Sequence, residues 1–187
     1  QPYPKHARIH FLYLGRIMKE KGIDELFYAV RHLKKENENF VLDLVGFFED
    51  EYKEQVKELE KHSIAHFYGF QSDPRPFYIE ADCVVLPSYH EGMSNVILEA
   101  AATGRPVITS NIPGCRESVE NGKSGLLVEV KNKEMLYDAM KEMLHCSREE
   151  REQMGQAGRE KMEREFRKEV VVEKTVQSLR EDEKRDF

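Results

Sequence analysis

Short apolar runs alternate with amphipathic stretches along the chain, and this alternation predicts its fold. Runs such as 40–45 and 83–86 are continuously apolar or nearly so, as expected for strands buried on both faces. The stripe between 23 and 33 repeats at helical spacing instead. The expected strands are 8–14, 40–45, 65–68, 83–86, 106–109 and 125–128, and the expected helices are 23–33, 52–59, 76–80, 96–102, 116–120 and 134–144.

Strands that alternate with helices in this way form an α/β domain with a mostly parallel sheet, wound by right-handed crossovers and covered by helices on both faces. Ligands of such doubly wound sheets bind outside the carboxyl ends of the strands. The chain places its conspicuous glycine and polar residues after successive predicted strands, so we expect one shared cleft. These residues are Arg16, Gly46, Gly69 with Phe70, Glu91 and Gly114.

The stretch from Pro87 to Glu99 joins a buried strand to an apolar helix and carries the most informative residues. Ser94 is a favourable N-cap residue, which would leave the first N–H groups of the following helix free to attract an anion. Gly104 stands where a left-handed C-terminal cap is expected. The pattern favours a site for a phosphate-bearing ligand.

Glu99 follows in the same helix among apolar neighbours, so we expect it to lie in a mostly dry environment. A carboxylate there needs partners. The adjacent hydroxyls of a ribose would suit its two acceptor oxygens, while backbone N–H groups or an arginine are the structural alternative. Arg16 and Lys21, which follow the first strand, could balance the charge of a diphosphate. The structural alternatives are a surface ion pair for Arg16 and a solvated side chain for Lys21.

Length and composition set limits on the class of protein. The 187 residues suffice for one domain with a sizeable core and are too few for two full α/β domains. The net charge of -6 gives no reason to expect a nucleic-acid partner. Three widely spaced cysteines without metal-ligand spacing favour a reducing, cytoplasmic location and no zinc site. No signal-peptide or membrane-spanning pattern is present, and the start at Gln1 without methionine suggests a piece cut from a longer protein.

Two familiar phosphate-binding motifs are excluded. Gly122-Lys123-Ser124 resembles the end of a P-loop, but Glu117 stands where that motif requires glycine. No Gly-x-Gly-x-x-Gly follows the first strand, so a nicotinamide or flavin site lacks its fingerprint. A bound diphosphate would therefore depend on other groups.

Several short motifs occur in order along the chain. They are Gly15-Arg16 with Lys21-Gly22, Pro87-Ser88, Glu91-Gly92 followed by Glu99, and Gly104-Arg105-Pro106-Val107. Together they resemble the retaining glycosyltransferases of family 4, also called group 1. The similarity runs from about Phe11 to Phe166, and it matches the C-terminal, donor-binding half of the two-domain GT-B architecture, a Rossmann-like domain.

The resemblance implies roles for individual residues. Arg16 and Lys21 match the basic pair that neutralises the donor's diphosphate without a metal, and Glu91 matches the acid that contacts the transferred sugar. Glu99 matches the ribose-binding acid, and Phe70 would lie near the nucleobase. The remaining implied donor-binding residues are Gly15, Gly92, Met93, Ser94 and Asn95.

The chain also departs from that pattern. Gly46 is followed by Phe47 and Phe48 where the family usually has a polar loop, and these rings could stack on a base or pack beneath the loop. Cys115 follows Gly114 where a Gly-Gly pair is common, which puts that loop's contact with the donor in doubt.

The resemblance implies that the acceptor-binding, amino-terminal half is missing and that this chain alone is inactive. We therefore assign residues 1–166 to a nucleotide-sugar-binding domain. The charge-rich end of the chain is expected to be solvated helix, and 167–187 to cross toward the missing half, with Val172, Val176 and Leu179 at helical spacing. The full-length protein could contact the inner face of the plasma membrane peripherally, through the missing half.

The function expected from these features is donor binding in a metal-independent, retaining hexosyltransferase. The expected donor is a UDP-sugar, with an N-acetylhexosamine donor considered, and the expected acceptor is a surface-polysaccharide or lipid-linked glycan. No metal or other cofactor is expected. Three alternatives stay open: a sugar-nucleotide epimerase of GT-B architecture, a non-catalytic nucleotide-sugar-binding module, and an α/β scaffold domain without a small ligand.

Overall fold

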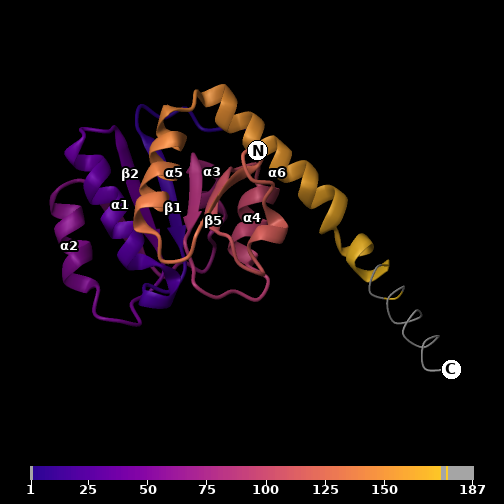
Figure 1. Ribbon diagram of the computed structural model, residues 1–187, viewed down its shortest axis with the longest axis horizontal. Helices are drawn as coiled ribbons and strands as arrows, with labels where there is room; N and C mark the ends of the chain where they lie inside the picture. The colour runs from indigo at the N-terminus through magenta and orange to yellow at the C-terminus, as the bar shows by residue number, and fades with distance from the viewer. Residues whose placement is uncertain (1, 174–175, 177–187) are drawn as a thin grey trace.

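A computed structural model of the chain describes residues 2–173 and residue 176. Six strands among them form one sheet in the order β3-β2-β1-β4-β5-β6, and every neighbouring pair is parallel. This confirms the doubly wound α/β sheet (Figure 1). The strands are β1 (Ile9–Leu14), β2 (Phe40–Val45), β3 (Ala65–Gly69), β4 (Cys83–Leu86), β5 (Val107–Ser110) and β6 (Gly125–Val128).

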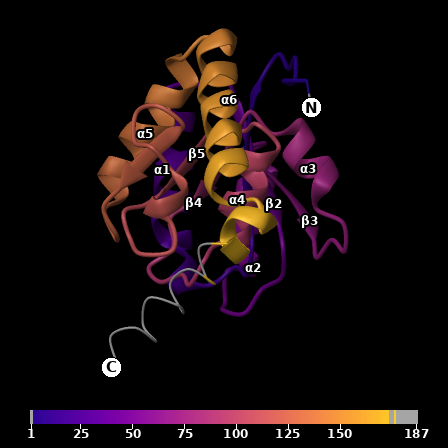
Figure 2. The ribbon, with the colours of Figure 1, turned by 90° about the vertical axis from the view of Figure 1, so that its right-hand side faces the viewer.

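Helices and two short 3-10 turns connect the strands. Helix α1 packs beside α5, and α4 packs beside α6, as Figures 1 and 2 show. The α-helices are α1 (Ile23–Lys35), α2 (Lys53–Lys61), α3 (Arg75–Glu80), α4 (Asn95–Ala102), α5 (Lys133–His145) and α6 (Arg148–Glu165). The 3-10 turns are η1 (Lys19–Lys21) and η2 (Arg116–Ser118).

The sheet order places β1 beside β4, and this pairing positions the site. The chain builds outward from β1 through β2 to β3, then returns to the middle and builds in the other direction through β4, β5 and β6. The two connections that leave β1 and β4 therefore diverge, which opens a crevice at the carboxyl ends of these strands. Both strands lie deep in the core; Phe11 and Val84 are fully buried.

Helix α6 corrects the prediction that the charged end of the chain is only solvated helix. It opens with a capping box in which Ser147 and Glu150 bond each other's backbone N–H groups. Its Gly155 and Gly158 then lie against the end of α4, and Met162 is buried. Glycines at the contact allow two helix backbones to approach closely, so a helix with few apolar residues still packs on the domain. The chain is also helical over 168–173 and at Val176, whereas Leu179 lies outside the described residues.

The segment before β1 is fixed by two arginines that bond its backbone. Arg105 donates to the carbonyl oxygen of Pro2 at 2.9 Å, and Arg148 donates to those of Tyr3 at 3.0 Å and Pro4 at 3.1 Å. The Tyr3 ring lies under the Arg105 guanidinium, 5.0 Å from ring centroid to guanidinium carbon, and its hydroxyl donates to the carbonyl oxygen of Asp82. The entry to β1 is thereby anchored to α6.

The loop after β2 carries acids that lie before the following helix. The helix expected over 52–59 begins at Lys53. Glu49 accepts from Arg16, and Asp50 accepts from the backbone N–H of Lys19. The two neighbouring phenylalanines have different environments. Phe48 packs on Phe67 with ring centroids 4.7 Å apart, while Phe47 is half exposed. These acids therefore tie two loops together at the sheet edge.

Among the residues that the structure describes, no helix is both long enough and apolar enough to cross a bilayer.

Two glycines of α6 provide a test of the close contact with α4. A Cβ at position 155 would lie 2.0 Å from the carbonyl oxygen of Gly104, whereas one at position 158 would meet Ala101 at an ordinary 3.5 Å. We expect Gly155→Ala to lower the free energy of unfolding by about 2 kcal/mol or more through overpacking.

Gly158→Ala serves as the matched control, because it gains helix propensity without a clash; it should be neutral or stabilising by up to about 1 kcal/mol. Urea unfolding measures both values. Equal losses at the two positions would contradict the close contact.

Candidate functional site

The crevice between β1 and β4 contains a pocket of about 240 Å³. Its walls come from two loops, the one after β1 and the one that joins β4 to α4. The apolar part of the lining is Leu14, Leu86 and Val96, and the remaining lining residues are Gly15, Lys21, Glu91, Met93, Ser94 and Asn95. The structure thus brings together six of the ten residues predicted for the site.

An ion pair joins the two loops across this pocket. Lys21 Nζ lies 2.7 Å from Glu91 Oε1, and the two side chains are only 17% and 14% exposed. In a partly buried setting the attraction between such charges is screened much less than at the surface. Without a ligand, the principal cation and the principal anion of the pocket neutralise each other.

The N-terminus of α4 opens onto the same pocket. Ser94 occupies the N-cap position as predicted, but its side chain makes no capping hydrogen bond. The N–H of Ile97 donates to the carbonyl oxygen of Ser94, so the prediction that this group is free was wrong. The N–H groups of Asn95 and Val96 have no acceptor within the described residues. With no acid in its first turn, α4 presents two open donors and a positive dipole end to the pocket.

Helix α1 also begins at this edge of the sheet, but acids occupy its first turn. Asp24 accepts from the Tyr52 hydroxyl at 2.9 Å, and both carboxylate oxygens of Glu25 lie 2.9 Å from the Tyr89 hydroxyl. These acids already complement the positive end of the α1 dipole. An anion entering the crevice is therefore directed to α4 and not to α1.

Tyr89 connects the two loops behind the ion pair. Its N–H donates to the carbonyl oxygen of Glu20 at 2.8 Å, so the neighbour of Lys21 is bonded to a residue close to Glu91. Gly22 adopts φ 71°, and a Cβ there would lie 2.1 Å from the carbonyl oxygen of Pro87. Tyr89 could not be recognised from the sequence, because its partners are distant along the chain and no local pattern marks them.

The family model for glycosyl transferases group 1 matches residues 3–161. The chain belongs to this family. The capsular polysaccharide biosynthesis glycosyltransferase CapM of Staphylococcus aureus is 30% identical over 164 residues, which are 86% of this chain and 43% of CapM. The lipopolysaccharide core biosynthesis glycosyltransferase LpsE of Rhizobium meliloti is 29% identical over 89% of this chain and 48% of its own length. The chain spans less than half the length of either relative.

Solved structures place this group 1 domain within the GT-B architecture. The C-terminal domain of the group 1 protein LpcC from Francisella tularensis has a TM-score of 0.72 and 26% identity, with coverage of 89% of this chain and 96% of that one. Anabaena HepE, solved in complex with UDP, shares the fold at a TM-score of 0.79 and 20% identity, over 93% of this chain and 49% of its own. This chain corresponds to the C-terminal half of the fold, as predicted.

Four predicted residues of the group 1 site do not line the pocket, and Arg16 and Phe70 are two of them. Arg16 is half exposed and pairs with Glu49 at 2.9 Å, the structural alternative considered for it. Phe70 is 70% exposed and follows β3, the outermost strand, so β2 stands between it and β1. Neither residue lines the pocket, and the carboxyl end of β3 lies two strands away from that of β1. The roles predicted for Arg16 and Phe70 stay predictions.

Glu99 contradicts the expectation of a dry environment: it is exposed. In the eight-residue helix α4, the buried positions are Ile97, Ala100 and Ala101, and position 99 lies off that face. Burial is the largest cause of the raised pKa of the Tyr78 phenol, and the nearby Glu99 carboxylate raises it further. The argument from desolvation therefore falls, and the ribose-binding role of Glu99 rests on the resemblance alone. Gly92 is exposed as well.

Buried groups beneath the pocket titrate outside the neutral range. Burial and the Glu91 charge raise the pKa of Tyr13, whose hydroxyl donates to the carbonyl oxygen of Arg16. Burial raises the pKa of the Cys115 thiol to about 11. Cys83, Cys115 and Cys146 are free thiols. Among the described residues, no group of three or more His, Cys, Asp or Glu is arranged to hold a metal ion.

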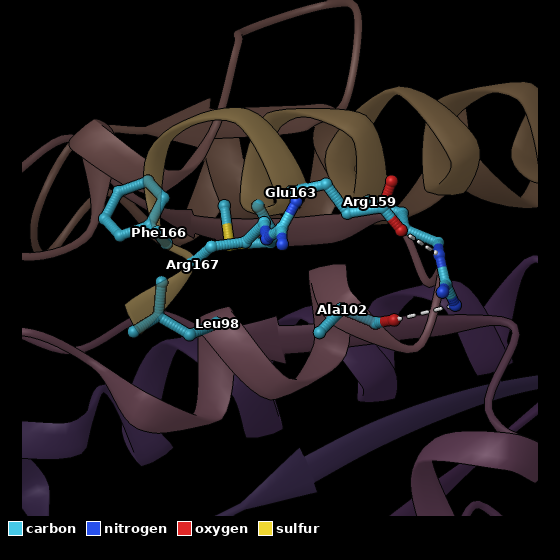
Figure 3. A pocket seen from close by; sticks show the side chains of 7 residues that line it. Leu98, Ala102, Arg159, Glu163, Phe166 and Arg167 are labelled. Carbon is cyan, nitrogen blue, oxygen red and sulfur yellow. Dashed lines mark hydrogen bonds and ion pairs between the residues drawn. The ribbon is translucent and has the colours of Figure 1, made fainter. Parts of the chain in front are cut away.

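A second pocket, of about 280 Å³, lies between α4 and α6 (Figure 3). Leu98 and Ala102 come from α4, while Arg159, Glu163 and Phe166 come from α6 or its end. Arg159 is held by Glu163 at 3.0 Å and by the carbonyl oxygen of Ala102 at 3.3 Å. This pocket lacks an open helix N-terminus, so the crevice between β1 and β4 is the better candidate for an anion.

The strength of the ion pair can be measured with a double-mutant cycle. We expect Lys21→Ala and Glu91→Ala to show a coupling energy of about 1–3 kcal/mol, because each single change leaves a mostly buried charge without its partner. The exposed pair of Lys57 and Glu54, also 2.7 Å apart, is the matched control and should couple by less than about 0.5 kcal/mol. Urea unfolding without nucleotide provides the values, and equal coupling in both pairs would refute the special strength of the pair in the pocket.

Proposed function

We propose that this chain is the donor-binding half of a retaining, metal-independent glycosyltransferase that uses a UDP-sugar. The observation that carries the proposal is the arrangement of hydrogen-bond donors in the crevice between β1 and β4. There the Lys21 ammonium and the two open N–H groups of α4 face one pocket. A diphosphate is the group of a nucleotide sugar that such a site would bind.

Donor binding would exchange the partners of the ion pair. The diphosphate would take the Lys21 ammonium from Glu91, so the charge that balances the leaving nucleotide would come from a side chain. The freed Glu91 carboxylate would accept hydrogen bonds from hydroxyl groups of the sugar. Stabilisation of the negative charge that grows on the leaving diphosphate lowers the barrier to transfer. This exchange gives Lys21 and Glu91 catalytic roles in the proposal.

The remaining loop residues would bind the donor. The backbone N–H groups of Asn95 and Val96 would hold a phosphate oxygen, and Gly15 and Gly92 would let the donor approach the backbone closely. Met93, which is half exposed, and Ser94 line the same side of the pocket. Glu99, one turn further along α4, would reach the ribose from its exposed position. Arg16 would approach the diphosphate only after leaving Glu49.

The relatives support this choice of donor and acceptor. HepE has been solved in complex with UDP, and CapM and LpsE are named for capsular polysaccharide and lipopolysaccharide core biosynthesis. We therefore propose UDP as the nucleotide and a surface-polysaccharide or lipid-linked glycan as the acceptor. Retention of configuration is proposed from the family resemblance. The acceptor would be bound by a further half of the protein, so this domain alone would not catalyse transfer.

The first test is calorimetric titration of UDP, with GDP as comparison, into the chain in EDTA. We expect saturable binding of UDP, weakened about tenfold or more by Lys21→Ala because a charge-assisted contact to the diphosphate is lost. Lys57→Ala, which removes an equally paired but exposed lysine, should leave the affinity unchanged. Absence of binding by the unchanged chain at millimolar UDP and GDP, or equal affinity in the Lys21→Ala variant, would refute the proposed site.

The ion pair also predicts a gain of affinity. Because UDP has no sugar for Glu91 to contact and must displace its carboxylate from Lys21, we expect Glu91→Gln to bind UDP several-fold more tightly than the unchanged chain. Glu54→Gln is the control, since its lysine partner lies at the surface. The same titration measures both variants. Weaker binding of UDP by Glu91→Gln would show that Glu91 helps to bind the nucleotide and does not compete with it.

A further inference from the structure

The loop between β5 and η2 supports the loop that carries Glu91. Gly114 lies in this supporting loop at φ 85°, and a Cβ there would meet the carbonyl oxygen of Gly92 at 1.4 Å and that of Glu91 at 2.8 Å. The Gly114 backbone therefore presses directly on the backbone of the proposed catalytic acid. Only glycine allows both the left-handed conformation and the close approach.

A hydrogen bond links the same glycine to the start of α4. The Gly114 carbonyl oxygen accepts from the N–H of Ser94 at 3.1 Å. Ser94 is the N-cap residue, and the two open N–H groups follow it directly. The position of the supporting loop thus sets both where Glu91 lies and where the open end of α4 points.

Glu117 fixes that glycine from the other side. Its Oε2 accepts from the N–H of Gly114 at 2.7 Å, while its Oε1 lies 3.6 Å from Arg116 Nε, a long contact at the surface. The Glu117 side chain is 45% exposed. The short contact of this half-exposed carboxylate is with a backbone N–H and not with the neighbouring arginine. Glu117 therefore holds the Gly114 peptide in one orientation.

Further contacts bind the supporting loop to the pocket loop. The Ser118 hydroxyl faces Met93 Sδ at 3.9 Å, and Cys115 is fully buried. Together with Glu117, these residues belong to or precede the short turn η2, which also packs against α4. The turn is therefore fixed on the core and can serve as a rigid support.

We propose that Glu117 is a positioning residue for the donor site: its carboxylate orients the Gly114 peptide, and that peptide holds Glu91 and the N-terminus of α4 where the diphosphate binds. The inference rests on the proposed function for the identity of the ligand. It predicts that a change at Glu117, which does not contact the donor, measurably alters the affinity for the donor.

An electrostatic role for Glu117 would have the opposite sign. A carboxylate near a diphosphate repels it, so removal of the charge would tighten binding. A positioning role predicts weaker binding when the acceptor atom is lost. Glutamine separates the two, because it keeps an acceptor oxygen for the Gly114 N–H and removes the charge.

The test compares Glu117→Ala and Glu117→Gln by titration of UDP in EDTA at 25 °C, with thermal unfolding to confirm that both variants are folded. We expect Glu117→Ala to weaken binding about tenfold, which corresponds to about 1.4 kcal/mol, and Glu117→Gln to restore most of it. Glu120→Ala is the matched control: its carboxylate bonds Lys123 and Arg164 and no N–H of the supporting loop, so affinity should stay near that of the unchanged chain.

Amide hydrogen exchange at Gly114 and Ser94 provides a readout that does not depend on nucleotide. Exchange at both amides should be faster in Glu117→Ala and near the original rate in Glu117→Gln. Unchanged or tighter UDP binding by Glu117→Ala, or a glutamine variant as weak as the alanine variant, would overturn the positioning role while leaving the proposed function intact. If the unchanged chain binds no nucleotide, the proposed function fails and the donor part of this inference falls with it; exchange then decides whether Glu117 holds the loop.

Discussion

The adjacency of β1 and β4 in the sheet is the constraint on which the site depends. Because the chain winds outward in opposite directions from these two strands, their loops diverge and leave a crevice that neither loop fills. Lys21 comes from one loop and Glu91 from the other, so the pair that closes the crevice joins positions 70 residues apart. Tyr89 and Gly114 hold the two sides in place, and the charges of Lys21 and Glu91 balance each other in the pocket.

Two helices begin at this edge of the sheet, and their different first turns decide which of them can receive an anion. Helix α1 has its own carboxylates in its first turn, each bonded to a tyrosine hydroxyl, whereas the first turn of α4 has no acid and its N-cap has no side-chain hydrogen bond. Two N–H groups without a partner in the chain stay accessible to water or to the acceptor atoms of a ligand. In a group 1 domain with this arrangement, a bound anion would take those two donors from water.

The sequence was sufficient for the fold because its signals are local. Continuous apolar runs for buried strands and the 3.6-residue period for helices predicted the ends of these elements to within two residues. The pocket loop could also be predicted, since one stretch carries Glu91, Ser94 and Asn95. Three features could not. The exposure of Glu99 depends on which side of α4 faces the sheet, the separation of Phe70 depends on strand order, and the bond from Glu117 to Gly114 depends on a turn without a clear pattern. Each is set by tertiary packing, which propensity does not encode.

The anchor of the amino-terminal segment has a consequence for how the sequence can vary. Arg105 and Arg148 bond the carbonyl oxygens of residues 2–4, and every amino acid supplies that oxygen. Substitutions of Pro2 and Pro4 should thus be tolerated, because they leave these carbonyl bonds and the path of the backbone into β1 unchanged. The two arginines are not exchangeable in this way, because the planar guanidinium directs its separate N–H groups at carbonyl oxygens in fixed directions, which a lysine ammonium does not reproduce. Among homologous chains, substitutions should therefore be more frequent at Pro2 and Pro4 than at Arg105 and Arg148.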